Sequence, residues 1–443
     1  MTKRYAGLCV CAAALALVCG VRAASAADDA AALQAQNDAL RARVDKLGSE
    51  MEQVKAALAE QGKSGAAKTE KPKLIDVQAY GTIKLDAAHD DSRTSVGNFA
   101  RWVESEGAVK NDDQFSMTAN QTRLGLLVSG PNNPNLKTSG QVEVDFYGNG
   151  AAENKPDPMM RHAFLKAEWP DLNFSFLAGQ TFDIISPLTM PTINYTVGWW
   201  QGDIGYRRPQ IRLTQGVKLA DEVEFKLEGG PTRTITDRKF VYTSATDVDS
   251  GADAGFPTLQ GRASLSFPLF NGKISTIGVS GHWGQEQEHL TNSVGAVDRS
   301  TDSTTWSGNV DARLPVTDWL LFQGEGFVGK NLSAYLGGIG QGFDVTRNEG
   351  IGAKGGWAAA TFGPWGKWQF NLGAGVDAVN ESDVTANAKA PPRLTNLVYF
   401  GNGSYALTSN LLIALEISYL KTTYKDAPDG DDWREQLAAM YKF

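Results

Sequence analysis

The sequence predicts an all-β transmembrane barrel of about 16 antiparallel strands, preceded by an N-terminal helical coiled coil. Three observations lead to this fold class. The chain begins with an export segment, and no later apolar run is long enough for a membrane helix. From residue 74 onward, apolar and polar residues alternate with a period of two. The polar faces carry charge in almost every segment, which a soluble sandwich cannot bury but a wide, water-filled barrel accommodates.

The first 26 residues have the parts of a secretory signal peptide. Basic residues precede an apolar run from Gly7 to Val21, and small residues favour cleavage after Ala26. A lipoprotein signal is a less favoured alternative, because Val18 rather than a small residue precedes Cys19. The mature chain is expected to have no thiol, disulfide or cysteine metal site, since the segment contains all three cysteines, Cys9, Cys11 and Cys19.

The charge of the chain restricts its partners. The formal net charge is −8, and removing the three basic residues of the signal peptide makes it −11. This acidic balance argues against nucleic acid as a partner. Membrane lipids and small solutes are the partners expected for a barrel of this kind.

Residues 27–61 are expected to form a coiled coil in the periplasm. Apolar residues recur at alternating spacings of four and three, a period of 3.5 that is typical of a heptad repeat. Such a repeat implies an oligomer, and the polar Asn37 would fix its register. A single amphipathic helix lying on the barrel is the alternative. The repeat positions are Leu33, Asn37, Leu40, Val44, Leu47, Met51, Val54 and Leu58.

Residues 62–73 have the composition of a linker, and residues 74–443 are assigned to the barrel. Its first strand, between Ile75 and Asp86, has mainly apolar residues at odd positions and polar ones at even positions. One such strand would also suit a soluble sheet, so the inference depends on repetition. The pattern recurs near residues 141–147, 211–219, 223–228, 259–267, 306–314, 367–377 and 413–420.

The last segment, Asp431–Phe443, is expected to close the barrel. Its apolar face should contact lipid, with a terminal aromatic residue at the membrane interface. Its other face should point into the lumen. The apolar positions are Leu437, Ala439, Tyr441 and Phe443, and the polar positions are Arg434, Gln436 and Lys442.

Two kinds of connection alternate between the strands. Short segments at 130–135, 169–171 and 268–272 are typical of periplasmic turns. Long polar segments are expected to be extracellular loops. About 16 strands fit this alternation, an even number that leaves both ends of the barrel in the periplasm. The expected loops lie near residues 90–114, 237–255, 285–302, 329–348 and 380–392.

One long connection, from Asp183 to Trp200, is more apolar than the others. An apolar loop on a barrel packs either into the lumen or across a subunit interface. We therefore expect this loop to narrow the lumen. Its candidate constriction residues are Asp183, Pro187, Tyr195, Trp199 and Trp200.

Several short motifs together resemble the DcaP-like trimeric porins. They are the N-terminal heptads, Tyr80-Gly81, Gln121-Thr122-Arg123-Leu124-Gly125, Arg161-His162-Ala163-Phe164, Gly179-Gln180-Thr181-Phe182 and Arg207-Arg208-Pro209-Gln210-Ile211-Arg212. The resemblance covers nearly all of the mature chain. It implies a homotrimer of 16-stranded barrels in the outer membrane of a Gram-negative bacterium. It also implies passive diffusion of small hydrophilic solutes, with dicarboxylates or related organic anions as the suggested class.

Anion preference requires basic side chains at the narrowest point of a pore. The candidates on polar strand faces are Arg123, Arg212, Arg262 and Arg313, and Arg207 and Arg208 lie beside the expected constriction. Acidic residues also fall on these faces. The alternative reading is therefore that the charges pair along the wall and only keep the lumen wet.

Other function classes have weaker support. The sequence contains no Gly-x-Ser-x-Gly elbow, and we expect no enzymatic activity, cofactor or metal. A sugar-type or phosphate-type porin remains an alternative. A structural anchor that contacts the cell wall through its coiled coil is another.

Overall fold

The computed structural model describes Asp38, Lys46 and Ser49 and residues 75–107, 112–148, 156–235, 254–291, 297–344 and 346–443. The predicted signal peptide and linker lie outside these residues. So does the predicted coiled coil, except for its three single helical positions. The part described in detail is the barrel.

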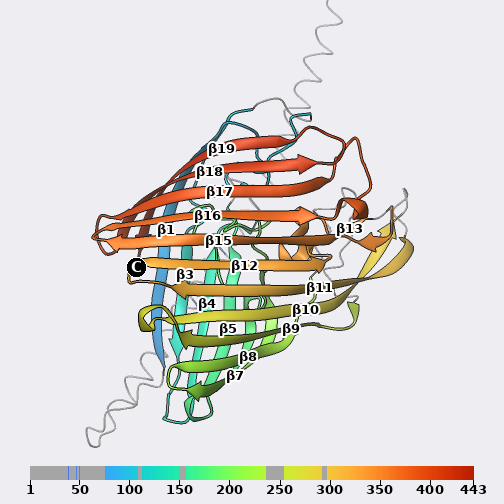
Figure 1. The fold of residues 1–443 in the computed structure, drawn as a ribbon. Coiled ribbons are helices and arrows are strands. Elements are labelled where there is room, and N and C mark those ends of the chain that lie inside the picture. Colours follow the sequence, from blue (N-terminus) through green and yellow to red (C-terminus); the bar gives the residue numbers. More distant parts are fainter. Residues whose placement is uncertain are drawn as a thin grey trace, which may run out of the picture. The chain divides into compact units, whose positions relative to one another are not determined.

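The barrel consists of long antiparallel strands that follow one another in chain order (Figure 1). Two further short strands, β13 (Phe343–Asp344) and β14 (Glu349–Gly350), form a separate hairpin. The strands of the barrel are β1 (Asp76–Asp90), β2 (Gln114–Thr118), β3 (Arg123–Ser129), β4 (Lys137–Asp145), β5 (Met159–Trp169), β6 (Phe174–Phe182), β7 (Arg207–Ala220), β8 (Val223–Thr232), β9 (Thr258–Pro268), β10 (Ile274–Thr291), β11 (Val297–Pro315), β12 (Leu320–Lys330), β15 (Gly352–Trp365), β16 (Trp368–Val379), β17 (Arg393–Ala406), β18 (Leu411–Tyr424) and β19 (Gly430–Lys442).

The sheet closes on itself, because β1 pairs with β19 as well as with β2 and β3. β2 and β3 occupy one position, since β2 pairs with the end of β1 and β3 with its beginning. A tight turn, in which Thr122 N donates to Ala119 O, separates them. The described residues therefore form a closed barrel of 16 strands, as the sequence predicts. Closure pairs the backbone groups of the first and last strands, which a lipid environment requires.

The alternation in the sequence matches the two faces of the wall. In β19, Leu437 and Tyr441 are about half exposed on the outer face, whereas Arg434 and Gln436 are buried inside. Phe443 extends the seam beyond the strand, where its backbone exchanges two hydrogen bonds with Gly81. The structure thus confirms that the last segment closes the barrel, with the predicted apolar residues on its outer face and Arg434 and Gln436 on its inner face.

The connections after β5, β7, β9, β11, β15 and β17 are short, and those after β4, β6, β8, β12 and β16, at the other end of the barrel, are long, as expected. Among the short ones are the 3-10 turns Pro170–Leu172 and Phe270–Gly272. None of the helical segments described is long and apolar enough to cross a membrane.

One of the expected extracellular loops is mostly paired strand, and another is a connection that folds inward. Most of the segment 285–302 is paired strand, because β10 continues to Thr291 and β11 begins at Val297. The segment 329–348 is a connection, as expected, but much of it folds inward, since residues 331–340 are all buried and only residues 346–348 are exposed among those described. The expected loop at 237–255 lies almost entirely outside the described residues.

Candidate functional site

The connection between β6 and β7, residues 183–206, lies inside the barrel and crosses its lumen. We call this segment the lumen loop. It contains no charged residue between Asp183 and Asp203, so backbone and hydroxyl groups must hold it in place. Side chains from strands on different sides of the barrel bond to these groups. They are Lys84, Gln260, Ser280, Gln323, Glu325, Asn396, Asn402, Glu416 and Gln436.

The lumen loop begins at a buried salt bridge. Arg208 Nε lies 2.7 Å from Asp183 Oδ1, and neither side chain is exposed. Gln260 on β9 donates to the same oxygen at 2.7 Å and accepts a hydrogen bond from Ile184 N. Tyr206 N donates to the other oxygen of Asp183. These contacts fix both ends of the loop together, and a buried pair of this kind is costly to break.

The middle of the loop is attached to Glu325 on β12. Ser186 Oγ lies 2.8 Å from Glu325 Oε2, and Leu188 N donates to Glu325 Oε1 at 2.8 Å. Ser186 Oγ also lies 3.1 Å from Asp203 Oδ1 at the returning end of the loop. Burial, together with the nearby Glu325 carboxyl, raises the pKa of Asp203 well above its usual range. A single wall residue thus holds both limbs of the loop.

The far part of the loop is attached to Glu416 on β18. Thr192 Oγ1 donates to Glu416 Oε1 at 2.5 Å, and Ile193 N donates to Oε2 at 2.8 Å. Asn402 on the neighbouring strand donates to Pro191 O at 2.8 Å. Hydrogen bonds to a charged group are stronger than those between neutral groups, so this contact is a major anchor of the loop.

Aromatic side chains hold the returning limb. The rings of Tyr195 and Tyr147 stack with centroids 3.8 Å apart, and Phe99 contacts both Tyr195 and Trp200 edge-on. The Tyr195 hydroxyl donates to Asp145 Oδ2 at 2.8 Å. Burial raises the pKa of Tyr195 to about 12, so the hydroxyl stays a donor. Because Phe99 belongs to the connection after β1, that connection packs against the lumen loop.

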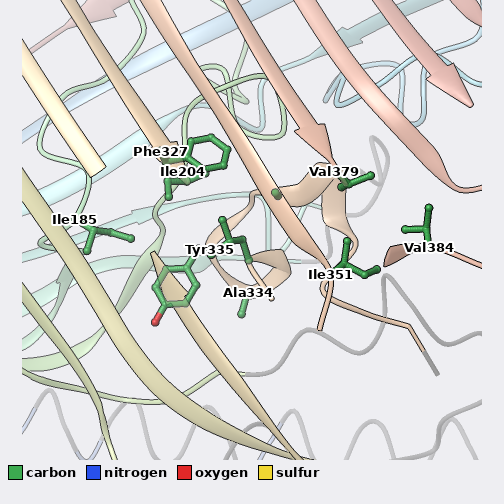
Figure 2. Close-up of a cluster of buried hydrophobic side chains, with 10 residues drawn as sticks. Ile185, Ile204, Phe327, Ala334, Tyr335, Ile351, Val379 and Val384 are labelled. Carbon is green, nitrogen blue, oxygen red and sulfur yellow. The ribbon is translucent and has the colours of Figure 1, made fainter. Parts of the chain in front are cut away.

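A second connection, after β12, also folds inward. Figure 2 shows Tyr335 and Ala334 of this segment in a buried cluster with Ile185 and Ile204 of the lumen loop. The Tyr335 ring stacks on His282 with a centroid distance of 3.8 Å. The Arg208 guanidinium lies 4.0 Å from the centroid of the Tyr335 ring. This packing supports the beginning of the lumen loop from behind.

A cavity of about 700 Å³ lies between the lumen loop and the barrel wall. Wall residues from β1, β3 to β8 and β19 line one side, and the loop lines the other. The wall side is rich in cations, which are Lys84, Arg123, Arg161, Arg212 and Lys442.

The acidic residues of the cavity are neutralised by close partners. Glu143 lies 2.6 Å from Arg161 Nε and accepts a hydrogen bond from Tyr80. Glu228 lies 3.2 Å from Arg262, a residue that also contacts Asp311 at 2.7 Å. Asp183 is paired with Arg208, as described above, and the raised pKa of Asp203 favours its neutral form. The accessible charge of the cavity is therefore positive.

The six arginines predicted from the sequence are placed differently. Arg123 and Arg212 line the cavity, and Arg123 has no ion-pair partner within 4 Å among the described residues. Arg212 donates to Phe182 O at 2.6 Å and lies at the edge of pairing distance from Glu228, at 4.0 Å.

The other four arginines do not line the cavity. Arg208 is fully buried in its salt bridge, and Arg262 is held by its two acidic partners. Arg207 is buried, and its guanidinium lies 5.0 Å from the centroid of the Tyr206 ring. The rings of Phe182 and Trp199 are also near this guanidinium. Arg313 is exposed on the inner face of β11 outside the cavity.

The five loop residues predicted to form the constriction all lie in the lumen loop. Asp183, Pro187, Tyr195 and Trp199 line the cavity. Trp200 is buried behind it, among the aromatic residues.

Sequence reasoning did not assign Lys84 or Arg161 to the site. Lys84 could have been found, since it lies on the polar face of the first strand; its Nζ is 2.9 Å from Asp86 and donates to Ile193 O. Arg161 occupies a β-bulge, at which the register between β4 and β5 shifts. The bulge lets both Arg161 and His162 line the cavity. A period of two alone cannot predict this.

No group of three potential metal ligands comes together in the part of the chain that the structure describes. His282, a buried histidine of β10, bonds Ser307 at 2.7 Å and Thr305 at 2.9 Å through its two ring nitrogens. Both hydroxyls lie on the neighbouring strand, so this histidine has a packing role.

No family model matches the chain, and no curated protein matches it significantly. Solved structures do. The outer membrane channel DcaP of Acinetobacter baumannii is similar with a TM-score of 0.64 and 20% identity, over 85% of this chain and 100% of that chain. OprB of Pseudomonas putida is similar with a TM-score of 0.51 and 9% identity, over 83% of this chain and 94% of that chain. An anion-selective porin from Comamonas acidovorans is similar with a TM-score of 0.50 and 12% identity, over 83% of this chain and 100% of that chain. The chain thus has the fold of outer-membrane channels, and the resemblance to DcaP-like proteins is confirmed at the level of the fold.

Proposed function

We propose that this protein is an outer-membrane porin through which small organic anions, dicarboxylates among them, diffuse passively. The observation that carries the proposal is the charge of the cavity. Five cationic side chains line its wall. Lys84 is paired with Asp86, and Arg161 with Glu143 and Asp145, whereas Arg123 has no ion-pair partner among the described residues. An anion that enters the cavity therefore meets cationic groups, some of which have no close counter-charge.

The lumen loop makes this charge effective. By filling part of the lumen, it brings a passing solute close to the wall and removes part of its hydration. At 4 Å, two unit charges interact with about 4 kcal/mol where the effective dielectric constant is 20, compared with about 1 kcal/mol in water. Selectivity is set at this point and not by the acidic total charge of the chain.

We assign solute contact to Arg123 and Arg212, supported by Lys84 and Arg161. Arg207 and Arg208 also serve the solute pathway, but their role is to position the lumen loop. Arg262 holds Glu228, and Arg313 lies on the inner face of β11 outside the cavity. Transport of this kind requires no cofactor and no covalent step.

The proposed assembly is a homotrimer in the outer membrane of a Gram-negative bacterium. The apolar outer faces of the strands, such as Leu437 and Tyr441 on β19, suit contact with lipid or with a neighbouring barrel. The N-terminal heptads would join the subunits in the periplasm or contact the cell wall.

The reversal potential of the purified protein in a planar bilayer under a salt gradient tests the function. We expect anion-selective current in three equal steps, partly blocked by succinate. Cation selectivity would overturn the assignment of the arginines. An absence of current would favour the structural anchor.

A further inference from the structure

Between Asp183 and Asp203, the lumen loop presents no charged side chain to the cavity. Nineteen residues separate Asp183 from Asp203, and none of them is an aspartate, glutamate, histidine, lysine or arginine. Tyr195 can ionise, but burial raises its pKa to about 12. Pro187 and Thr189 are exposed on this face, and Leu188, Ile193 and Val197 are half-buried on it. All five line the cavity.

The opposite face of the cavity is the cationic wall. Arg123, Arg212 and Lys84 belong to it. The cavity thus has two chemically different sides, one that attracts negative charge and one that offers mainly hydrocarbon. A small hydrated anion could use only the first side.

We infer that the cavity selects amphipathic organic carboxylates, with an anionic end against the wall and an apolar body against the lumen loop. The inference rests on the proposed function and specifies its solute class. A binding site of this type combines a mostly apolar surface with a few polar groups that fix orientation. Hydrocarbon length therefore matters in addition to charge.

The two sides should make separate contributions to recognition. Burial of one methylene group corresponds to about a fourfold change in affinity when it is complete. Because the loop covers only one side of a solute, we expect about a twofold change for each methylene. The cationic wall should act equally on all carboxylates of the same charge.

The experiment uses the full-length protein in planar bilayers and compares acetate, butyrate and hexanoate as blockers of chloride current at constant ionic strength. The half-blocking concentration should fall about twofold for each added methylene. Bilayers without protein control for partition of hexanoate into lipid. Equal block by all three anions would overturn the inference while leaving the anion-selective porin intact. A loss of anion selectivity itself would instead overturn the proposed function.

Two loop variants and one wall variant locate the effect. Leu188→Gln and Ile193→Gln, tested separately, should weaken block by hexanoate and leave block by acetate unchanged. Arg123→Gln should weaken block by both anions by the same factor. Leu172→Gln is the matched control, because it makes the same kind of change at an exposed position in the turn Pro170–Leu172, outside the cavity. Retention of the chain-length dependence in both loop variants would contradict the inference.

Discussion

Asp203 and Glu325 share one serine hydroxyl. Ser186 Oγ lies 3.1 Å from the Asp203 carboxyl and 2.8 Å from the Glu325 carboxyl. A hydroxyl has one hydrogen, and an ionised carboxylate only accepts. Both contacts are satisfied fully only if one carboxyl group is protonated and donates to the serine oxygen. This three-residue contact, the Ser186 clasp, therefore includes a proton.

The clasp predicts that the lumen loop is held less firmly as the pH rises. The pKa of Asp203 is raised, so the contact stabilises the loop while the carboxyl is protonated and is lost as the pH rises through that raised value. The next acidic neighbour of Glu325, Asp311, is already paired with Arg262. We expect the fluctuations of the single-channel current to increase as the pH is raised.

Glu325→Gln provides the control for this effect, because an uncharged amide both donates and accepts. Its current should be steady across the same pH range. Equal pH dependence in the variant and the parent protein would show that the clasp does not control the loop.

Removal of the charge of Arg123 should reduce anion selectivity. In Arg123→Gln the reversal potential under a salt gradient should move toward zero, because Arg123 lines the cavity and has no close acidic partner among the described residues. Arg313→Gln is the matched change, since it removes the same charge from an exposed position outside the cavity. The reversal potential should shift clearly more in Arg123→Gln than in Arg313→Gln. Equal shifts would indicate that the whole lumen, and not the cavity, sets selectivity.

Two arginines four residues apart on β7 should differ in their effect on stability. Arg208→Met leaves Asp183 buried without its partner, which costs about 3–5 kcal/mol. Arg212→Met exposes no comparable buried charge. Heat conversion of the folded barrel, followed by its shift in electrophoretic mobility, should occur at a lower temperature only in Arg208→Met. Similar transitions for both variants would exclude a special role for the Arg208 salt bridge.

The barrel could be predicted because its evidence is local. A strand such as β19 records in its own sequence which side chains face lipid and which face the lumen. The lumen loop was predictable for the same reason, since its apolar composition is incompatible with a solvated loop. The inward position of residues 331–340 depends instead on partners distant in sequence, such as His282 for Tyr335.

The roles of individual arginines were harder to predict. Arg123 and Arg208 look alike in the sequence, yet one lines the cavity and the other is buried by Asp183 and Tyr335. The lumen position of Arg161 results from a register shift between two strands, which a regular alternation does not reveal. Long-range pairing therefore decides which cations a solute can reach.

The anchor at Glu416 should control the width of the pathway. Thr192 and Ile193 both donate to this carboxylate, and hydrogen bonds to charged groups contribute about 1.5–3 kcal/mol each. Glu416→Ala should release the far part of the lumen loop, because no charged side chain of the loop itself can replace these bonds. We expect a larger single-channel conductance and weaker anion selectivity, since solutes would pass farther from the cationic wall.

Ser409→Ala is a suitable control for this prediction, because Ser409 is exposed in the turn that precedes β18 and bonds only its neighbour Asn410 among the described residues. Its conductance should equal that of the parent protein. If Glu416→Ala kept the parent conductance and selectivity while still folding as a heat-resistant barrel, the lumen loop would have to be held by its aromatic limb at Tyr195 and Tyr147. The carboxylate would then be a satisfied wall residue without a part in setting the pore.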